Sequence, residues 1–197
     1  MPEPRSRAAV GGLRVLAHPL RLRLLSLLTG AAFSAAEAAR ALDETQANVS
    51  YHLRRLHAAG LVELVEEIGV RGGRAKRYRH DPGSGEHLVA QSPEEHLLVA
   101  AALGEELRRR SAERSPAGEG ELTDAELWID PGEWQAIRQH ARELGEELHA
   151  AARPPHTPGA VRVSATVVLF EMTRDGGSGE AGNSEGGEGG RSDGGQP

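Results

Sequence analysis

Apolar and polar residues recur with helical spacing in two short segments, residues 35–42 and 46–59, which a few polar residues separate. Ser34 and Glu37 have the spacing of a capping box, in which each side chain accepts a hydrogen bond from a backbone N–H at the helix start. Thr45 is suited to cap the second segment in the same way. The pattern therefore predicts two helices joined by a tight turn.

The second segment carries a single apolar stripe. Val49, Leu53 and Leu56 fall at positions i, i+4 and i+7, so they lie on one face of a helix and are expected to face the core. Gly60 follows at the position where a left-handed residue commonly ends a helix. The stripe leaves the opposite face to solvent or to a partner.

Polar side chains occupy that opposite face, and their chemistry suits the edges of DNA bases. Amides pair well with adenine, arginine pairs with guanine or phosphate, and a tyrosine can touch a thymine methyl group or a phosphate. The alternative is an ordinary helical hairpin with a polar, solvated face. The candidate DNA-contacting residues are Thr45, Gln46, Asn48, Ser50, Tyr51, Arg54 and Arg55.

A β-hairpin is predicted directly after the second helix. Residues 61–67 and 75–80 form two extended runs, and the glycine-rich residues 69–73 connect them. A helix-turn-helix followed by such a hairpin is a winged helix, whose wing can grip phosphates or enter the minor groove. A solvated charged hairpin is the alternative, and we disfavour it because the basic cluster has one sign of charge. This cluster comprises Arg71, Arg74, Lys76, Arg77 and Arg79.

Residues 13–81 resemble the ArsR family and related bacterial winged-helix repressors. The resemblance rests on the leucine-rich segment 15–28, which contains His18-Pro19, on residues 48–62, which read Asn-Val-Ser-Tyr-His-Leu-Arg-Arg-Leu-His-Ala-Ala-Gly-Leu-Val, and on the wing. It covers a little over a third of the chain. It implies a homodimer that binds an operator in double-stranded DNA and usually represses transcription. By position, the resemblance implies groove contacts from Gln46, Asn48, Ser50, Tyr51 and Arg54, and backbone contacts from the wing arginines.

The distribution of charge agrees with this interpretation, although the formal net charge of the whole chain is −6. Residues 1–81 hold 13 basic and 8 acidic residues, whereas the remainder holds 10 basic and 21 acidic residues. The positive charge therefore lies in the predicted DNA-binding part. An acidic remainder limits indiscriminate binding to nucleic acid.

The chain contains no cysteine, which excludes disulfides and thiolate chemistry. Many relatives in the ArsR family sense soft metals through cysteine pairs, and here residues 35–42 offer none. Another pattern of that family uses carboxylates and histidines after the wing. Because the available side chains lack the spacing that a closed four-ligand site requires, we predict no metal and no cofactor. Those side chains are Glu86, His87, Glu94, Glu95 and His96.

A long helix is predicted at residues 93–114. Ser92 and Pro93 suit its start, and its apolar surface is rich in small residues. A single helix cannot bury such a face, so we expect it to pair with the same helix of a second subunit. Packing against its own winged-helix domain is the alternative. The surface consists of Leu97, Ala100, Ala101, Leu103, Gly104 and Leu107.

The C-terminal part is predicted to form a strand, a helix and a second strand, at residues 126–129, 131–152 and 161–172. This unit is too small for a complete core, so we expect it to pack on the dimer helix or on its own copy. Trp128 and Trp134 are expected to fill its core, and an apolar pocket for an unknown small-molecule effector is the alternative.

The predicted fold class is α+β. It comprises a winged helix-turn-helix DNA-binding domain at residues 1–91, a dimerisation helix at 92–114, the strand-helix-strand unit at 121–173 and a disordered tail at 174–197. The sequence contains neither a bilayer-spanning apolar run nor a signal-peptide core, so a cytoplasmic location is expected.

An enzyme is not expected, because no constellation of nucleophile, base and glycine-rich loop is present. The predicted function is a transcriptional regulator that reads a DNA sequence as a homodimer. A winged helix that serves only protein–protein contact is the alternative, and the polar groove-facing residues with the basic wing argue against it.

Overall fold

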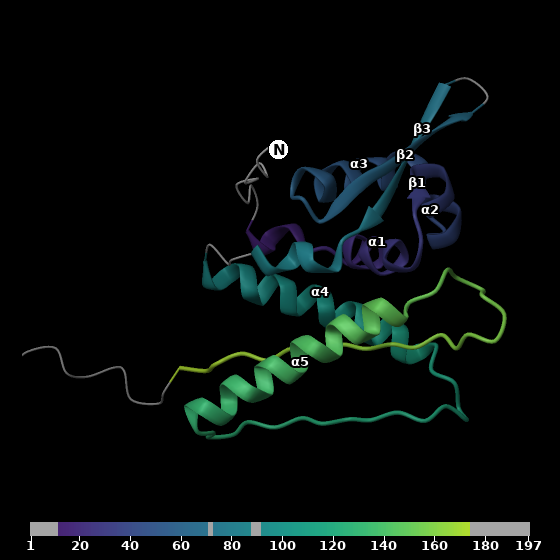
Figure 1. The fold of residues 1–197 in the computed structure, drawn as a ribbon. Coiled ribbons are helices and arrows are strands. Elements are labelled where there is room, and N and C mark those ends of the chain that lie inside the picture. The colour runs from purple at the N-terminus through teal and green to yellow at the C-terminus, as the bar shows by residue number, and fades with distance from the viewer. Residues whose placement is uncertain (1–11, 71–72, 88–91, 174–197) are drawn as a thin grey trace, which may run out of the picture. The chain divides into compact units, whose positions relative to one another are not determined.

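The computed structural model describes residues 12–70, 73–87 and 92–173, and its first part is a winged helix-turn-helix (Figure 1). The elements appear in the order expected for that fold, so the predicted α+β class is confirmed. They are the 3-10 helix η1 (Leu13–Val15), α1 (Pro19–Gly30), β1 (Phe33–Ser34), α2 (Ala35–Leu42), α3 (Gln46–Ala58), β2 (Val62–Val70) and β3 (Gly73–His80).

Side-chain caps fix the starts of α1 and α2. The ring Nδ1 of His18 accepts a hydrogen bond from the N–H of Leu20 at 3.2 Å. The predicted capping box of α2 is confirmed: the Glu37 N–H donates to Ser34 Oγ at 3.3 Å, and the Ser34 N–H donates to Glu37 Oε2 at 2.7 Å. Asp43 ends α2 in the left-handed region at φ 53°. These local contacts set the tight turn before α3.

The boundaries of α3 also follow the sequence signals. Thr45 Oγ1 accepts a hydrogen bond from the N–H of Asn48 at 3.3 Å, as predicted for the N-cap. Gly60 adopts φ 77°, and the N–H of Leu61 reaches back to the carbonyl of Leu56 at 3.0 Å. A left-handed glycine therefore closes the helix, which ends one residue earlier than predicted.

The core of the winged helix lies between α1, α2, α3 and the base of the sheet. Val49, Leu53 and Leu56 are almost completely buried, so the predicted inward stripe of α3 is confirmed. Leu24 and Leu28 of α1 are buried with them. Each fully buried leucine contributes about 1.5–3 kcal/mol relative to an exposed one, so this cluster holds α3 in position.

The three strands form an antiparallel sheet in the order β1-β3-β2. Leu64 pairs with Tyr78, and a β-bulge interrupts the register between Leu64 and Glu66. Tyr78 is buried, and its ring lies 5.6 Å from the ring of His57 on α3. Both strands are longer than predicted, because regular pairing continues outward to Val70 and Gly73.

Helix α4 (Pro93–Ala112) follows the short 3-10 helix η2 (Pro82–His87) and packs on η1 and α1 through a face that includes Ala102 and Glu106. Leu97, on another face, is 72% exposed. This contact with the chain's own winged-helix domain is the predicted alternative to dimerisation. However, it uses only one face of α4, and the predicted apolar surface stays largely open.

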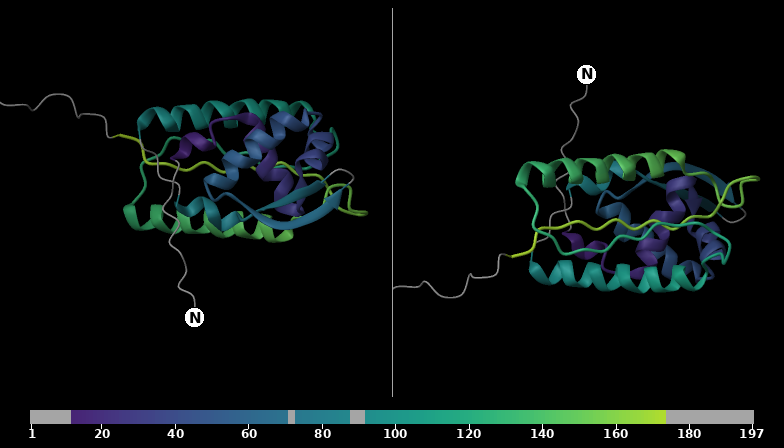
Figure 2. Two further views of the ribbon diagram at one scale, coloured as in Figure 1. Left: turned by 90° about the horizontal axis from the view of Figure 1, so that it is seen from above. Right: turned by 90° about the horizontal axis from the view of Figure 1, so that it is seen from below.

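Helix α5 (Pro131–Ala151) confirms the predicted C-terminal helix, and the N–H of Gly132 donates to Asp130 Oδ1 at 2.8 Å to cap it. Both α4 and α5 run without interruption (Figure 2).

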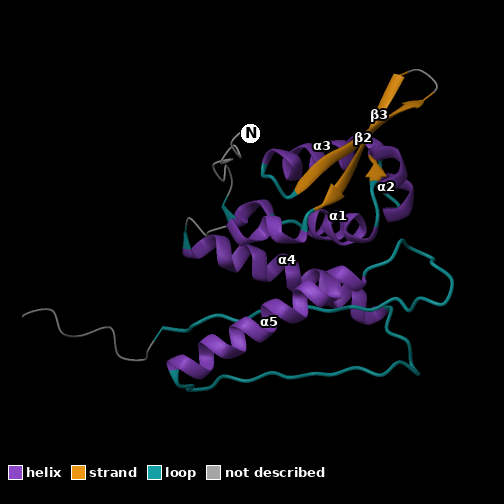
Figure 3. Ribbon diagram, in the orientation of Figure 1, coloured by secondary structure: helices purple, strands orange, loops and turns teal. Residues whose placement is uncertain are grey.

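The predicted strands at residues 126–129 and 161–172 are wrong for this single chain, where both segments are loops (Figure 3). Trp128 is 83% exposed, so its predicted place in a core is wrong as well. A strand needs the N–H and C=O groups of a neighbour, and residues 92–173 contain no strand that could supply them.

The chain divides between Val167 and Val168 into two units. The predicted tail at 174–197 lies outside the described residues, and the predicted domain boundaries stay predictions. None of the helices within the described ranges is long and apolar enough to cross a membrane.

Candidate nucleic-acid interface

The outer face of α3 is open and polar. Tyr51 lies at the centre of this face and is 49% exposed, whereas Ser50 is half-buried. The opposite face is in the core, so the helix presents a single surface outward. The other predicted residues on or next to this helix, namely Thr45, Gln46, Asn48, Arg54 and Arg55, are exposed.

Ala47 also lies on this face, although it is not among the residues predicted from the sequence. It is exposed, and it stands four residues before Tyr51 and seven before Arg54. Helical spacing alone could have identified it. A methyl group at this position can contact the methyl group of thymine.

Asn48 is oriented by a network of side chains that the helical spacing does not predict. Its Nδ2 donates to Glu44 Oε2 at 3.1 Å, and Arg23 Nη1 lies 3.5 Å from Glu44 Oε1. Arg23 Nη2 also donates to the carbonyl of Leu42 at 2.6 Å, which ties α1 to the turn before α3. Because a carboxylate only accepts hydrogen bonds, it directs the Nδ2 group of the amide toward Glu44 and leaves Oδ1 as an acceptor on the other side of the amide.

Two histidines and an arginine form a cluster where α3 meets the α1 region. The rings of His18 and His52 lie 4.4 Å apart, and His52 is buried. Burial and the nearby charge of His18 lower the pKa of His52 to about 4, so the ring is neutral at pH 7. Arg21 is buried beside them; it donates from Nη2 to the carbonyl of Arg14 at 3.2 Å, and burial lowers its pKa.

We expect acid to destabilise the winged helix through His52. Its folded-state pKa of about 4 lies below its ordinary value of 6.5, so only the unfolded chain takes up the proton between these values. The stability that depends on the neutral ring is fully present above pH 6.5 and is lost as the pH falls through this window toward 4. Urea unfolding of His52→Gln at pH 7.5 and pH 5 should show a smaller loss than the unaltered chain. His140→Gln, an exposed histidine of α5, is the control, and an equal loss in all three proteins would contradict the assignment.

The wing carries basic groups on the face that turns toward α3. Arg74 and Lys76 alternate with Tyr78 along β3, so they lie on the same face of the strand as the ring that meets His57. Both are exposed, and Arg74 Nε pairs with Glu67 at 3.1 Å. The predicted contact Arg71 lies outside the described residues.

Arg77 has a structural role, which corrects its assignment to the basic cluster. Its Nη2 donates to the carbonyl of Ala32 at 2.6 Å, and its guanidinium pairs with Glu66 at 3.1 Å and with Glu37 at 3.4 Å. It therefore links β3 to β1, β2 and the start of α2. The rest of the basic cluster is also opposed by acidic residues, because the glutamates of β2 pair with the basic residues of β3.

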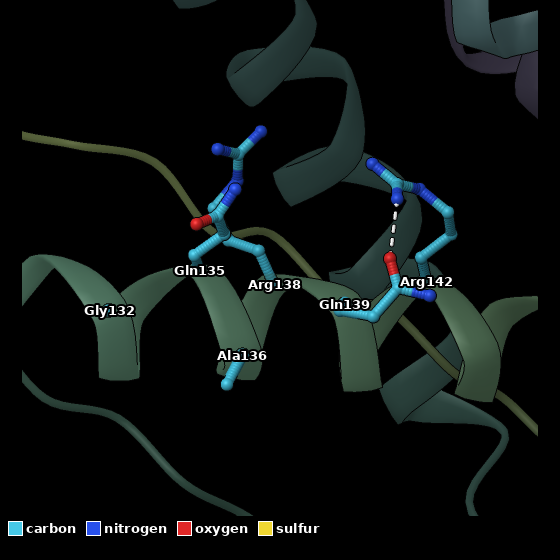
Figure 4. A pocket seen from close by; sticks show the side chains of 6 residues that line it. All are labelled: Gly132, Gln135, Ala136, Arg138, Gln139 and Arg142. Atoms are coloured by element: carbon cyan, nitrogen blue, oxygen red, sulfur yellow. Dashed lines mark hydrogen bonds between the residues drawn. The ribbon is translucent and has the colours of Figure 1, made fainter.

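Helix α5 carries a hollow that is open to solvent. It is lined by exposed side chains, and Arg142 Nη1 donates to Gln139 Oε1 at 2.7 Å within it (Figure 4). Trp128 does not line it. Within the described ranges, no three histidine or carboxylate side chains are grouped to hold a metal ion. The lining residues are Gly132, Gln135, Ala136, Arg138, Gln139 and Arg142.

Comparison with known proteins agrees with this geometry. A family described as a helix-turn-helix domain matches residues 16–65, which include α1, α2, α3 and the first residues of β2. No curated protein matches the chain. The chain thus carries a helix-turn-helix domain, and this indicates DNA binding and a role in the regulation of transcription.

Proposed function

We propose that the chain is a sequence-specific transcriptional regulator of the ArsR type, which binds its operator as a homodimer and represses transcription. In this proposal the exposed face of α3 enters the major groove, and the wing lies along the adjacent backbone. One observation carries it: α3 buries its apolar face while its amide and guanidinium groups stay open. The candidate contacts are Thr45, Gln46, Asn48, Ser50, Tyr51, Arg54, Arg55, Arg71, Arg74 and Lys76.

The homodimer is part of the proposal because two recognition helices related by a two-fold axis read two half-sites about one helical turn apart. The open face of α4, with Leu97 and Leu107 exposed, supports such pairing.

A winged helix used only for protein contact would not need base-reading groups. The Arg23–Glu44–Asn48 network favours DNA readout, because it orients one amide oxygen at the start of α3. A protein interface would be expected to show an apolar centre instead.

Selection of bound fragments from the native genome by the purified full chain tests the proposal. We expect enrichment of a two-fold symmetric sequence, and gel-shift titration should give at least about 10³-fold preference over random DNA at physiological salt. Equal binding to all fragments, or none, would contradict sequence-specific regulation. Repeating the selection with metal salts and candidate metabolites would identify an effector.

Neutralising the wing should weaken binding to every DNA sequence. We expect Arg74→Gln with Lys76→Gln to remove two phosphate contacts and to reduce the slope of log K against log salt by about 2. Fluorescence anisotropy measures this slope. The titrations use operator and random duplexes at salt concentrations of about 50 to 200 mM. Arg138→Gln with Arg142→Gln on α5 is the matched control. A loss confined to the operator would show that the wing reads bases.

Glu44 is expected to act as a positioning residue for Asn48. Glu44→Ala removes the acceptor that holds Nδ2, so the amide can rotate and the preference for one base at its position should fall by about 1–3 kcal/mol. Binding-site selection followed by sequencing measures this loss at a single position of each half-site. Glu63→Ala on β2 removes an equal charge as a control. An unchanged base preference would contradict the role.

A further inference from the structure

Exposed apolar side chains are concentrated in the second half of the chain. Of the twenty large apolar side chains that are exposed in the described residues, only Tyr51, Leu64 and Val65 belong to the winged helix. The others lie beyond residue 92, where Ala102 is the only buried apolar residue among those described. Monomeric proteins rarely expose this much apolar surface, so the region is built to be covered.

Helix α5 shows this most clearly, because none of its residues is buried. Ile137, Ala141, Leu144 and Leu148 share one face at helical spacing, yet the three large residues among them are exposed. Most of the stability of a helix comes from packing of its apolar face rather than from intrinsic propensity. The face of α5 therefore needs a surface outside the described fold.

Residues 161–170 have the pattern of a strand without a partner. Val161, Val163, Ala165 and Val167 alternate with polar residues, and no charge occurs from Val163 to Phe170. Val161 and Val163 are 82% and 71% exposed. Because this segment is a loop here, it has the side chains of a buried strand but lacks the ladder that would stabilise one.

We propose that residues 161–170 of two copies of this chain pair as antiparallel strands across a two-fold axis at Ala165. The choice of a second copy rests on the proposed function, which requires a symmetric dimer. In this register Val163 lies opposite the partner's Val167, and Val161 opposite the partner's Leu169, so one face of the joint sheet is wholly apolar. The α5 helices of both copies cover that face and bury their own apolar stripes.

The contacts of Ala165 agree with this register. Its carbonyl accepts a hydrogen bond from Arg110 Nη1 at 3.3 Å, so this oxygen is directed toward α4. In an antiparallel pair, residues at non-hydrogen-bonded positions do not exchange backbone hydrogen bonds with the residue opposite. Ala165 can therefore occupy such a position at the axis, where the two strands approach most closely and a small side chain fits.

The proposed strand is also linked to the C-terminal end of α4. Arg162 pairs with Glu113 at 2.7 Å, and Arg110 Nη2 donates to Thr166 Oγ1 at 3.2 Å. These contacts hold the segment beside the C-terminal end of α4, whose outer surface includes Leu107 and Gly104. The ion pair and the hydrogen bond therefore position the segment next to α4 within each chain.

The absence of native cysteine makes a disulfide test clean. Ala165→Cys in the full chain should form an intermolecular disulfide rapidly under mild oxidation, since residues opposite each other at non-hydrogen-bonded positions have Cα atoms about 4.5 Å apart. Ala160→Cys is the control, because five residues from the axis its two copies would lie roughly 30 Å apart. Equal crosslinking of both variants, or of neither, overturns the proposed register.

Sedimentation of the full chain tests the interface itself. We expect a dimer of the 20.9 kDa chain, and Ile137→Glu with Val167→Asp should raise its dissociation constant at least about 100-fold by placing charges in the apolar interface. Gln135→Glu on the polar side of α5 should change it by no more than about twofold. A monomer at all concentrations, or a dimer insensitive to the double substitution, overturns the proposal. If the crosslink forms but no operator is found, the proposed function fails and this interface stands. If the operator is bound by a monomer, this interface fails and the proposed DNA binding stands.

Discussion

Leu53→Ala is expected to lower the free energy of unfolding of the winged helix by about 2–5 kcal/mol. Leu53 is 1% exposed and lies in the core with Leu24, Leu28 and Leu56, so removal of its side chain loses apolar contact and leaves a cavity. A small domain has only about 5–15 kcal/mol of stability in total. The substitution should therefore lower the melting temperature by roughly 10 °C or more, as measured by calorimetry or circular dichroism.

The neighbouring residue gives a matched control for this result. Arg54→Ala changes the next side chain on the same helix, which is exposed, and it should alter stability by no more than about 0.5 kcal/mol. If Leu53→Ala left the melting temperature unchanged, or if Arg54→Ala lowered it equally, the assigned orientation of α3 would be wrong.

The helices of the winged helix could be predicted from sequence because their signals are local. Ser34 with Glu37 and Thr45 with Asn48 satisfy backbone groups within four residues, so the chain fixes these helix starts without help from distant segments. The spacing of the apolar stripe then decides which face of α3 is buried.

Roles that depend on distant contacts could not be predicted in the same way. Arg77 resembles its basic neighbours in the sequence, and only the pairing of β3 with β1 brings it to the carbonyl of Ala32. His52 likewise lies on the edge of the apolar stripe, and its pKa is lowered first by burial and then by the nearby charges of His18 and Arg21 from the α1 region. The contacts of both residues lie within the folded domain, so their roles are structural and not in DNA contact.

The C-terminal region shows a different limit. Residues 126–129 and 161–172 have the composition of strands, yet a strand also depends on a neighbour with open hydrogen-bonding groups. The helix between them closes its hydrogen bonds within itself, so α5 forms while the flanking segments remain loops. The sequence pattern thus records the side chains of a strand, whereas strand formation depends on a partner edge that a single chain does not contain within its described residues.

Arg54→Ala is expected to weaken operator binding by about 1–3 kcal/mol, which corresponds to a change in Kd of roughly 5- to 150-fold. Arg54 is exposed on the face of α3 that also carries Ala47 and Tyr51, and its guanidinium can donate two hydrogen bonds to one guanine. Because these bonds are made only with the correct base, binding to random DNA should fall much less than binding to the operator.

Gel-shift titration of the operator and of a scrambled duplex at one salt concentration separates this effect from a general loss of charge. Arg138→Ala removes an equally exposed arginine from α5 and should leave both affinities unchanged. Operator variants with one changed base pair complete a double-mutant cycle. At the base pair that Arg54 reads, the change should weaken binding of the unaltered protein but not of the Arg54→Ala protein. Equal losses on both duplexes would show that Arg54 contacts phosphate. No loss on either duplex would contradict the placement of α3 in the major groove.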